Sequence, residues 1–191
     1  MATDVAITGA SGLVGGHLAA RLVADGARVR AIVRSHEAAA KAGERGAEPT
    51  LVDLFDHDGL RDAFWGAEVV YHVAGVNETC SRDPRAMDRV NIDGTRAVIE
   101  AAADAGVGRV VYTSSAAVIG EPQGTIGHEE TAHSGVFLSA YARSKKLAED
   151  VAFETAERRD VDLVAVLPSS VQGPGRATGS ARILLYVLTA D

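Results

Sequence analysis

The sequence predicts an α/β fold in which a doubly wound parallel sheet lies between two layers of helices. Short apolar runs rich in β-branched residues recur along the chain, and segments with helical spacing separate most of them. Apolar runs without polar alternation suit strands that are covered on both faces. Strands that alternate with helices are typical of βαβ units, so we expect three layers and one doubly wound sheet.

The individual elements follow from this alternation. The expected strands are residues 5–7, 29–33, 51–52, 69–73, 110–112 and 163–167, and the expected helices are residues 13–24, 35–43, 60–64, 87–105 and 141–159. Gly26 and Gly106 stand where two of these helices should end. Two regions depart from the pattern: a polar, glycine-containing segment at 120–140, and the apolar stretch 181–188, which has helical spacing.

Composition narrows the class of protein. The 191 residues are 47% hydrophobic and carry 19 Lys and Arg against 26 Asp and Glu, a net charge of −7. This is ordinary globular composition, which excludes disordered, collagen-like and disulfide-framework chains, and its acidity argues against nucleic-acid binding. Cys80 is the one cysteine. No positively charged leader precedes Val5 and no apolar run approaches 20 residues, so we expect a cytoplasmic protein without membrane segments.

The strongest local motif is the glycine-rich segment Thr-Gly-Ala-Ser-Gly-Leu-Val-Gly at residues 8–15, between the first strand and the first helix. There Gly9 permits a tight turn, Gly12 lets a pyrophosphate approach the backbone, and Gly15 lets the helix pack on the strand. The N–H groups and dipole at the helix start attract anionic phosphate. A purely structural turn would look similar, but the placement favours cofactor binding. The expected contacts in this turn are Gly9, Ser11, Gly12, Leu13 and Val14.

The end of the second strand indicates which dinucleotide is bound. An acidic residue there would hold the ribose 2′-hydroxyl of NAD, but the sequence has Arg34 and Ser35, with no acid before Glu37. A guanidinium suits a 2′-phosphate because it offers paired N–H donors. NADP is therefore favoured over NAD. The alternative is a solvated arginine at a strand end.

A tyrosine and a lysine four residues apart form the candidate catalytic pair. The spacing of Tyr141 and Lys145 places both side chains on one helix face. Free tyrosine has a pKa of about 10, and a nearby ammonium favours the phenolate. Such pairs are commonplace in helices, but here a glycine turn precedes the pair and Ser114 and Ser115 end the fifth strand, which favours catalysis.

Together these residues resemble the short-chain dehydrogenase/reductase superfamily, specifically its extended branch of epimerases, dehydratases and dihydroflavonol-reductase-like proteins. Further matching segments occur in the family's order along almost the whole chain. They are Asp53-Leu54, His72-Val73-Ala74-Gly75, Asn91-Ile92-Asp93-Gly94-Thr95, Thr113-Ser114-Ser115-Ala116, Pro168-Ser169-Ser170-Val171 and Gly173-Pro174-Gly175. The resemblance implies a Rossmann-type domain over residues 1–191.

The resemblance also implies the catalytic roles. Tyr141 would exchange a proton with a substrate hydroxyl or carbonyl, and Lys145 would tune Tyr141 and bind the nicotinamide ribose. Ser115 would hold the reacting oxygen; it is chosen over Ser114 because it directly precedes the alanine pair 116–117.

Further positions would contact the cofactor by the same resemblance. Asp53 and Leu54 would meet the adenine, and Asn91 would sit near the cofactor. The remaining expected contacts are Val73, Ala74 and Gly75 at its middle, and Pro168 and Val171 beside the nicotinamide. Each of these residues could instead serve a turn, a cap or packing, Asp53 and Asn91 most readily. His72 is interpreted as a core histidine rather than a catalyst.

The function implied is an NAD(P)-dependent oxidoreductase that moves hydride between nicotinamide and a carbonyl or hydroxyl carbon. The alternatives are a nucleotide-sugar epimerase or dehydratase, and a non-catalytic NADP(H)-binding sensor. Partners would be a small carbonyl or sugar substrate, with a homodimer as a hypothesis, and no metal is implied. Extended members continue for over a hundred residues more, so we expect the substrate domain to be largely missing.

Overall fold

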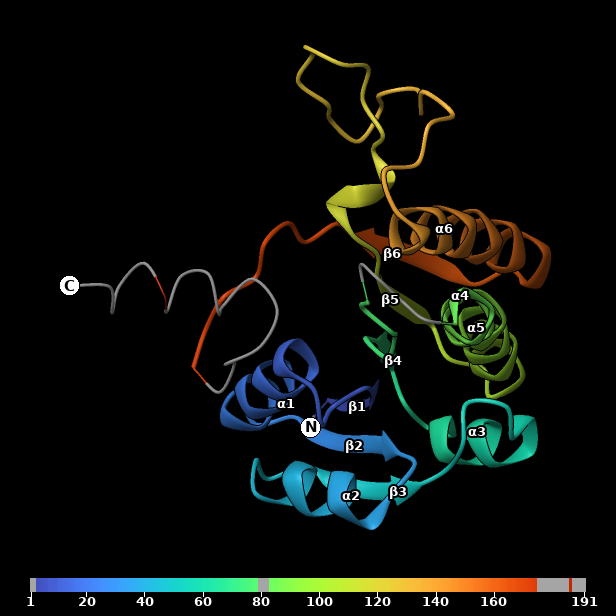
Figure 1. The fold of residues 1–191 in the computed structure, drawn as a ribbon. Helices are drawn as coiled ribbons and strands as arrows, with labels where there is room; N and C mark the ends of the chain where they lie inside the picture. Colours follow the sequence, from blue (N-terminus) through green and yellow to red (C-terminus); the bar gives the residue numbers. More distant parts are fainter. Residues whose placement is uncertain (1–2, 79–82, 175–185, 187–191) are drawn as a thin grey trace.

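The computed structural model describes residues 3–78, 83–174 and 186, and at its centre is a six-stranded sheet whose strands are all parallel (Figure 1). The spatial order is β3-β2-β1-β4-β5-β6. The strands are β1 (Asp4–Thr8), β2 (Arg28–Val33), β3 (Glu48–Leu51), β4 (Val69–His72), β5 (Arg109–Thr113) and β6 (Asp162–Val166). All six expected strands are confirmed. β3 begins earlier than predicted and includes Pro49, which an edge strand tolerates because one side of it needs no ladder hydrogen bonds.

Helices connect the strands. They are α1 (Leu13–Ala24), α2 (His36–Gly43), α3 (His57–Phe64), α4 (Pro84–Asp88), α5 (Gly94–Asp104) and α6 (Ala140–Arg159), with a turn of π-helix at Arg89–Asp93 and a 3₁₀ turn at Ala116–Val118. The single helix expected over 87–105 is wrong in one respect, because the π-helical turn interrupts it. Apolar spacing does not reveal one wide turn between two helical segments.

The helices form the two outer layers. α1 and α2 cover one face of the sheet, and α3, α5 and α6 cover the other (Figure 1). The larger core lies on the second face, where Leu60 and Phe64 of α3 and Val98 and Ile99 of α5 are fully buried. This arrangement confirms the three-layer, doubly wound prediction.

Two helices end as their glycines predict. Gly26 and Gly106 have positive φ angles of 87° and 71°. After α1, Ala27 N–H donates to Leu22 O at 2.9 Å and Gly26 N–H to Val23 O at 2.9 Å. This is the Schellman pattern, in which glycine takes the left-handed conformation at no steric cost.

The strand order reverses between β1 and β4, because the chain proceeds from β1 to β3 on one side and from β4 to β6 on the other. In such sheets a crevice opens at the carboxyl ends of the strands near this switch. Within the described residues, no helix has both the length and the apolar character needed to cross a bilayer. Cys80 and the predicted helix at 181–188 fall outside the described residues, apart from position 186.

Candidate cofactor-binding and active site

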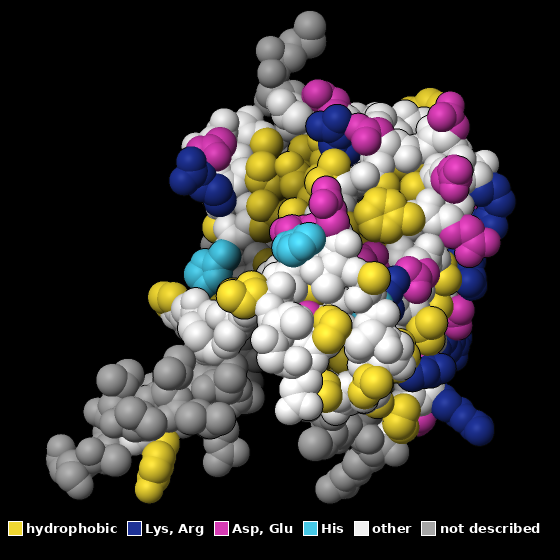
Figure 2. Space-filling model, turned by 90° about the horizontal axis from the view of Figure 1, so that it is seen from above, with side chains coloured by type: hydrophobic (Ala, Val, Ile, Leu, Met, Phe, Trp, Pro, Cys, Tyr) yellow, Lys and Arg dark blue, Asp and Glu magenta, His cyan; other side chains and the backbone are white. Residues whose placement is uncertain are grey.

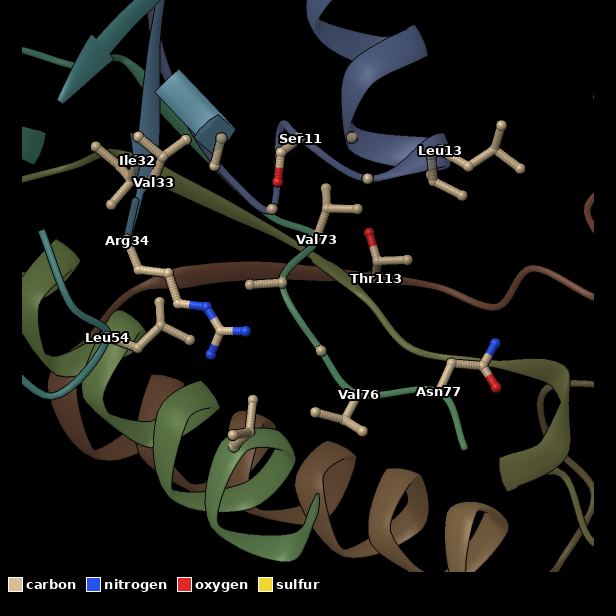
Figure 3. Close-up of a pocket in the computed structure, with 18 of the residues that line it drawn as sticks. Ser11, Leu13, Ile32, Val33, Arg34, Leu54, Val73, Val76, Asn77 and Thr113 are labelled. Carbon is tan, nitrogen blue, oxygen red and sulfur yellow. The ribbon is translucent and has the colours of Figure 1, made fainter. Parts of the chain in front are cut away.

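A groove of about 720 Å³ runs along the carboxyl ends of the strands, and the segments that follow all six strands line it. It brings together every predicted site residue except Asn91. The predicted residues that line it are Gly9, Ser11, Gly12, Leu13, Val14, Arg34, Asp53, Leu54, Val73, Ala74, Gly75, Ser115, Tyr141, Lys145, Pro168 and Val171. Figure 3 shows part of this wall, with Ser11 and Val73 near its middle.

The glycine turn lies so close to neighbouring backbone that side chains at two of its glycines would not fit. Gly9 has a φ of +75°, and a Cβ there would lie 2.6 Å from the backbone nitrogen of Ala74. A Cβ on Gly15 would lie 2.4 Å from Gly9 O. In the part of the chain that is described, no side chain caps α1 at Gly12. The first N–H groups of α1 are therefore available to an anion in the groove.

At the end of the groove expected to receive the adenine, here called the adenine end, the charged side chains of Arg34, Lys41 and Asp53 are exposed. Arg34 extends from the end of β2 into the groove, with Leu54 beside it (Figure 3). Asp53 lines the groove and also stabilises the turn after β3, because its Oδ1 accepts the Phe55 N–H at 2.9 Å. Lys41 of α2 lines the same end and pairs with Glu37 at 2.7 Å.

The end of the groove that holds the predicted catalytic residues, here called the catalytic end, lies where β5 ends and α6 begins. Ser115 Oγ accepts the Ala117 N–H at 3.2 Å, which starts the 3₁₀ turn. Ser139 Oγ caps α6 by accepting the Ala142 N–H at 3.0 Å. This cap places half-buried Tyr141 in the first turn of α6, and Lys145 follows one turn later on the same face.

Lys145 is held beneath the groove by β5. Its side chain is only 5% exposed, and its Nζ donates to the hydroxyl of Tyr112 at 2.8 Å and to Thr113 O at 2.9 Å. Burial lowers the pKa of Lys145 to about 8, and the nearby Glu149 carboxylate opposes that shift. The Lys145 ammonium, held by these two acceptors, therefore lies one helix turn after Tyr141 on the same face of α6.

A buried histidine lies behind the groove, as predicted for His72. The Thr8 hydroxyl accepts the backbone N–H groups of the two residues after His72, each at 3.2 Å, so its proton goes to His72 Nδ1, 2.7 Å away. His72 Nε2 therefore carries the hydrogen and donates to Thr95 Oγ1 at 3.0 Å. Complete burial, assisted by the charge of Lys145, lowers the pKa of His72 to about 3. The imidazole is neutral and structural.

Asn91 does not line the groove. It is 1% exposed and lies in the π-helical turn, behind the wall. Its Oδ1 accepts the Val76 N–H at 2.8 Å, and its Nδ2 donates to Val76 O at 3.0 Å and to Ser144 Oγ at 3.0 Å. The side chain therefore ties the loop after β4 to α6.

Several lining residues were not among the predicted site residues. They are Ile32, Val33, Ser35, Glu37, Ala38, Lys41, Val52, Phe55, Val76, Asn77, Val90, Thr113, Ser114 and Ser169. Ala38 and Lys41 could have been predicted from the sequence, because they stand three and six residues after the Ser35 cap and so share one helix face. The Val76–Asn77 pair carries no such signal, since only the path of the loop brings it to the groove.

The polar segment between β5 and α6 rises above the catalytic end in Figure 1. Ile126 and Leu138 in this segment are 95% and 96% exposed. The face of the molecule seen from this side carries hydrophobic, acidic and histidine side chains close together (Figure 2).

Comparison with known proteins gives consistent matches. A sequence model of the 3-beta hydroxysteroid dehydrogenase/isomerase family matches residues 6–187. Sterol demethylase protein B of Methylococcus capsulatus is 35% identical over 170 residues, which cover 88% of this chain and 51% of the relative. A putative dihydroflavonol 4-reductase of Synechocystis is 34% identical over 192 residues, 98% of this chain and 55% of the relative.

A solved structure agrees with these matches. Yeast methylglyoxal/isovaleraldehyde reductase Gre2, complexed with NADPH, is similar with a TM-score of 0.78 and 26% identity, over 90% of this chain and 59% of the yeast chain. The chain spans about half the length of the curated relatives it matches.

Proposed function

Because the chain belongs to the 3-beta hydroxysteroid dehydrogenase/isomerase family of extended short-chain dehydrogenases/reductases, we propose that it is the cofactor-binding part of an NAD(P)-dependent oxidoreductase. Its reaction would interconvert a carbonyl and a hydroxyl on a small molecule. One observation carries the proposal: the glycine turn, Ser115, Tyr141 and Lys145 line a single groove.

The residues of the groove fit a dinucleotide. The absence of a Cβ at Gly9 lets the turn lie directly against the backbone of Ala74, and the start of α1 supplies N–H donors for a pyrophosphate. Leu54 and Phe55 offer apolar surface at the adenine end, and Pro168 and Val171 line the other end. When bound, the nicotinamide would supply or accept the hydride.

The chain's own residues would handle the proton. In reduction, the Tyr141 hydroxyl gives its proton to the substrate oxygen and becomes a phenolate; in oxidation it takes the proton back. The Lys145 ammonium lowers the free energy of that phenolate, since opposite charges attract strongly where water is excluded. Ser115 would donate a hydrogen bond to the same oxygen and hold it in place.

Two cations at the adenine end support NADP over NAD. Arg34 reaches into the groove, and Lys41 lines it one helix turn beyond Ala38. A 2′-phosphate would gain charge-assisted hydrogen bonds from both side chains. The two carboxylates on this wall already have partners, since Asp53 accepts the Phe55 N–H and Glu37 pairs with Lys41.

The test is a fluorescence titration of the chain with NADPH and with NADH. We expect saturable binding of both, with NADPH bound more tightly. Equal affinities would contradict the assignment to NADP and leave the dinucleotide site intact. Binding of neither would contradict the proposed function of this chain.

A further inference from the structure

A fourth glycine, Gly16, follows the motif without a role in the turn. It is buried in the first part of α1, and glycine in a helix interior is unfavourable relative to alanine. A Cβ on Gly16 would lie 1.0 Å from Nη1 and 2.1 Å from Cζ of Arg45. The missing side chain therefore makes room for a guanidinium.

Arg45 reaches this space from beyond the end of α2. Its Nη1 donates to Ala10 O at 3.0 Å and to Gly12 O at 3.1 Å, both in the glycine turn. Arg45 does not line the groove, so the guanidinium lies behind the turn. Among the described residues, no carboxylate lies within ion-pair distance of Arg45, whereas Arg21 of α1 pairs with Asp25.

Fixing these two carbonyls also orients two amides. In a trans peptide the C=O and the following N–H lie in one plane and point in opposite directions. Arg45 holds Ala10 O at the back of the turn and is a second donor to Gly12 O, which also accepts the Gly16 N–H of α1 at 3.0 Å. The N–H groups of Ser11 and Leu13 therefore point to the opposite side. Both of these residues line the groove.

We propose that Arg45 is a positioning residue for the dinucleotide pyrophosphate. It aims the Ser11 and Leu13 amides into the groove and places a positive charge behind the turn that would receive the phosphates. Gly16 is glycine because this guanidinium occupies the place of its side chain. The inference rests on the proposed function, since it concerns the same dinucleotide site.

Binding of two different ligands distinguishes a role of Arg45 in pyrophosphate binding from a general role in stabilising the fold. NADPH contains the pyrophosphate, and adenosine 2′-phosphate occupies only the adenine end. In Arg45→Met we expect NADPH affinity to fall about tenfold, the size expected for one charge-assisted interaction, with adenosine 2′-phosphate affinity unchanged. Arg21→Met is the matched control: it removes the same charge from exposed α1 surface and should leave both affinities unchanged.

A second variant, Gly16→Ala, tests the same contact between α1 and the Arg45 guanidinium by changing the glycine instead of the arginine. The Cβ of Gly16→Ala would displace the flexible end of Arg45, so we expect a similar loss of NADPH affinity. Alanine is the better helix former, so thermal unfolding should show no loss of stability. The double variant Gly16→Ala/Arg45→Met should bind NADPH no more weakly than either single variant, because both remove one interaction.

Amide hydrogen exchange tests the orientation without any ligand. In Arg45→Met, exchange at Ser11 and Leu13 should be faster than in the wild type, and exchange in β5 should be unchanged. Unaltered NADPH affinity in Arg45→Met would overturn the inference, and so would an equal loss of both ligands. Failure of the wild type to bind NADPH would instead overturn the proposed function, and this inference with it.

Discussion

The two ends of the groove differ in how their polar residues are held. At the adenine end Arg34, Lys41 and Asp53 are exposed. At the catalytic end Lys145 is 5% exposed, Tyr112 and His72 are fully buried, and each of these three side chains has a fixed hydrogen-bond partner. Substitution at the first end therefore affects binding with little effect on folding, whereas substitution at the second end affects both.

The difference follows from which parts of the fold supply the residues. Loop tips beyond β2 and β3 supply the adenine end, next to the edge strand. The catalytic end draws on β4, β5 and α6, which enclose the larger core. We therefore expect cofactor preference to be easily altered in this chain, and the proton-transfer machinery to be altered only together with its surroundings.

The largest expected effect is on turnover in Tyr141→Phe. Removing the hydroxyl removes the proton donor, so turnover of any carbonyl substrate found by screening with NADPH should fall at least about a hundredfold. NADPH affinity should be unchanged, since the ring remains. Tyr71→Phe, on β4, is the control and should retain turnover. A Tyr141→Phe variant with full turnover would show that another group supplies the proton.

The next effect concerns cofactor choice at the exposed end. If Arg34 pairs with a 2′-phosphate, Arg34→Ala should weaken NADPH binding by about 1.5–3 kcal/mol. NADH binding and the midpoint of thermal unfolding should barely change, because Arg34 is exposed at a strand end. Calorimetric titration measures both affinities. Equal losses for the two dinucleotides would show that Arg34 does not discriminate between them.

The third effect is a pH dependence at the buried end. Burial lowers the folded-state pKa of His72 from 6.5 to about 3, so the folded state binds this proton less readily than the unfolded state. The stability associated with His72 is full above pH 6.5 and declines as pH falls toward 3. Between pH 7 and pH 5 the decline should be about 2 kcal/mol.

Urea unfolding at the two pH values measures this contribution. His72→Gln keeps a polar side chain that does not titrate, so the variant should lose less stability than the wild type over the same interval. Identical losses in the two proteins would mean that His72 is not desolvated in the folded chain.

The features predicted from residue spacing are local ones. The glycine turn, the Tyr141–Lys145 pair and the glycine caps each depend on residues close together in the chain, so spacing was sufficient to identify them. The contacts that escaped prediction join distant elements: Arg45 reaches the turn from 33 and 35 residues away, and Lys145 meets Tyr112 across 33 residues. Asn91 was predicted to lie near the cofactor, but the π-helical turn directs it to Val76 behind the wall.

The π-helical turn at Arg89–Asp93 makes this part of the chain sensitive to length. A π-turn holds one residue more than an α-turn, and the helices on either side keep their register with the core. Loss of one residue here would let the segment close as continuous α-helix, with α4 and α5 still packed as before. Asn91 would then no longer reach Val76, and the groove wall would lose its anchor. A single-codon deletion here would therefore leave the fold in place and damage the groove.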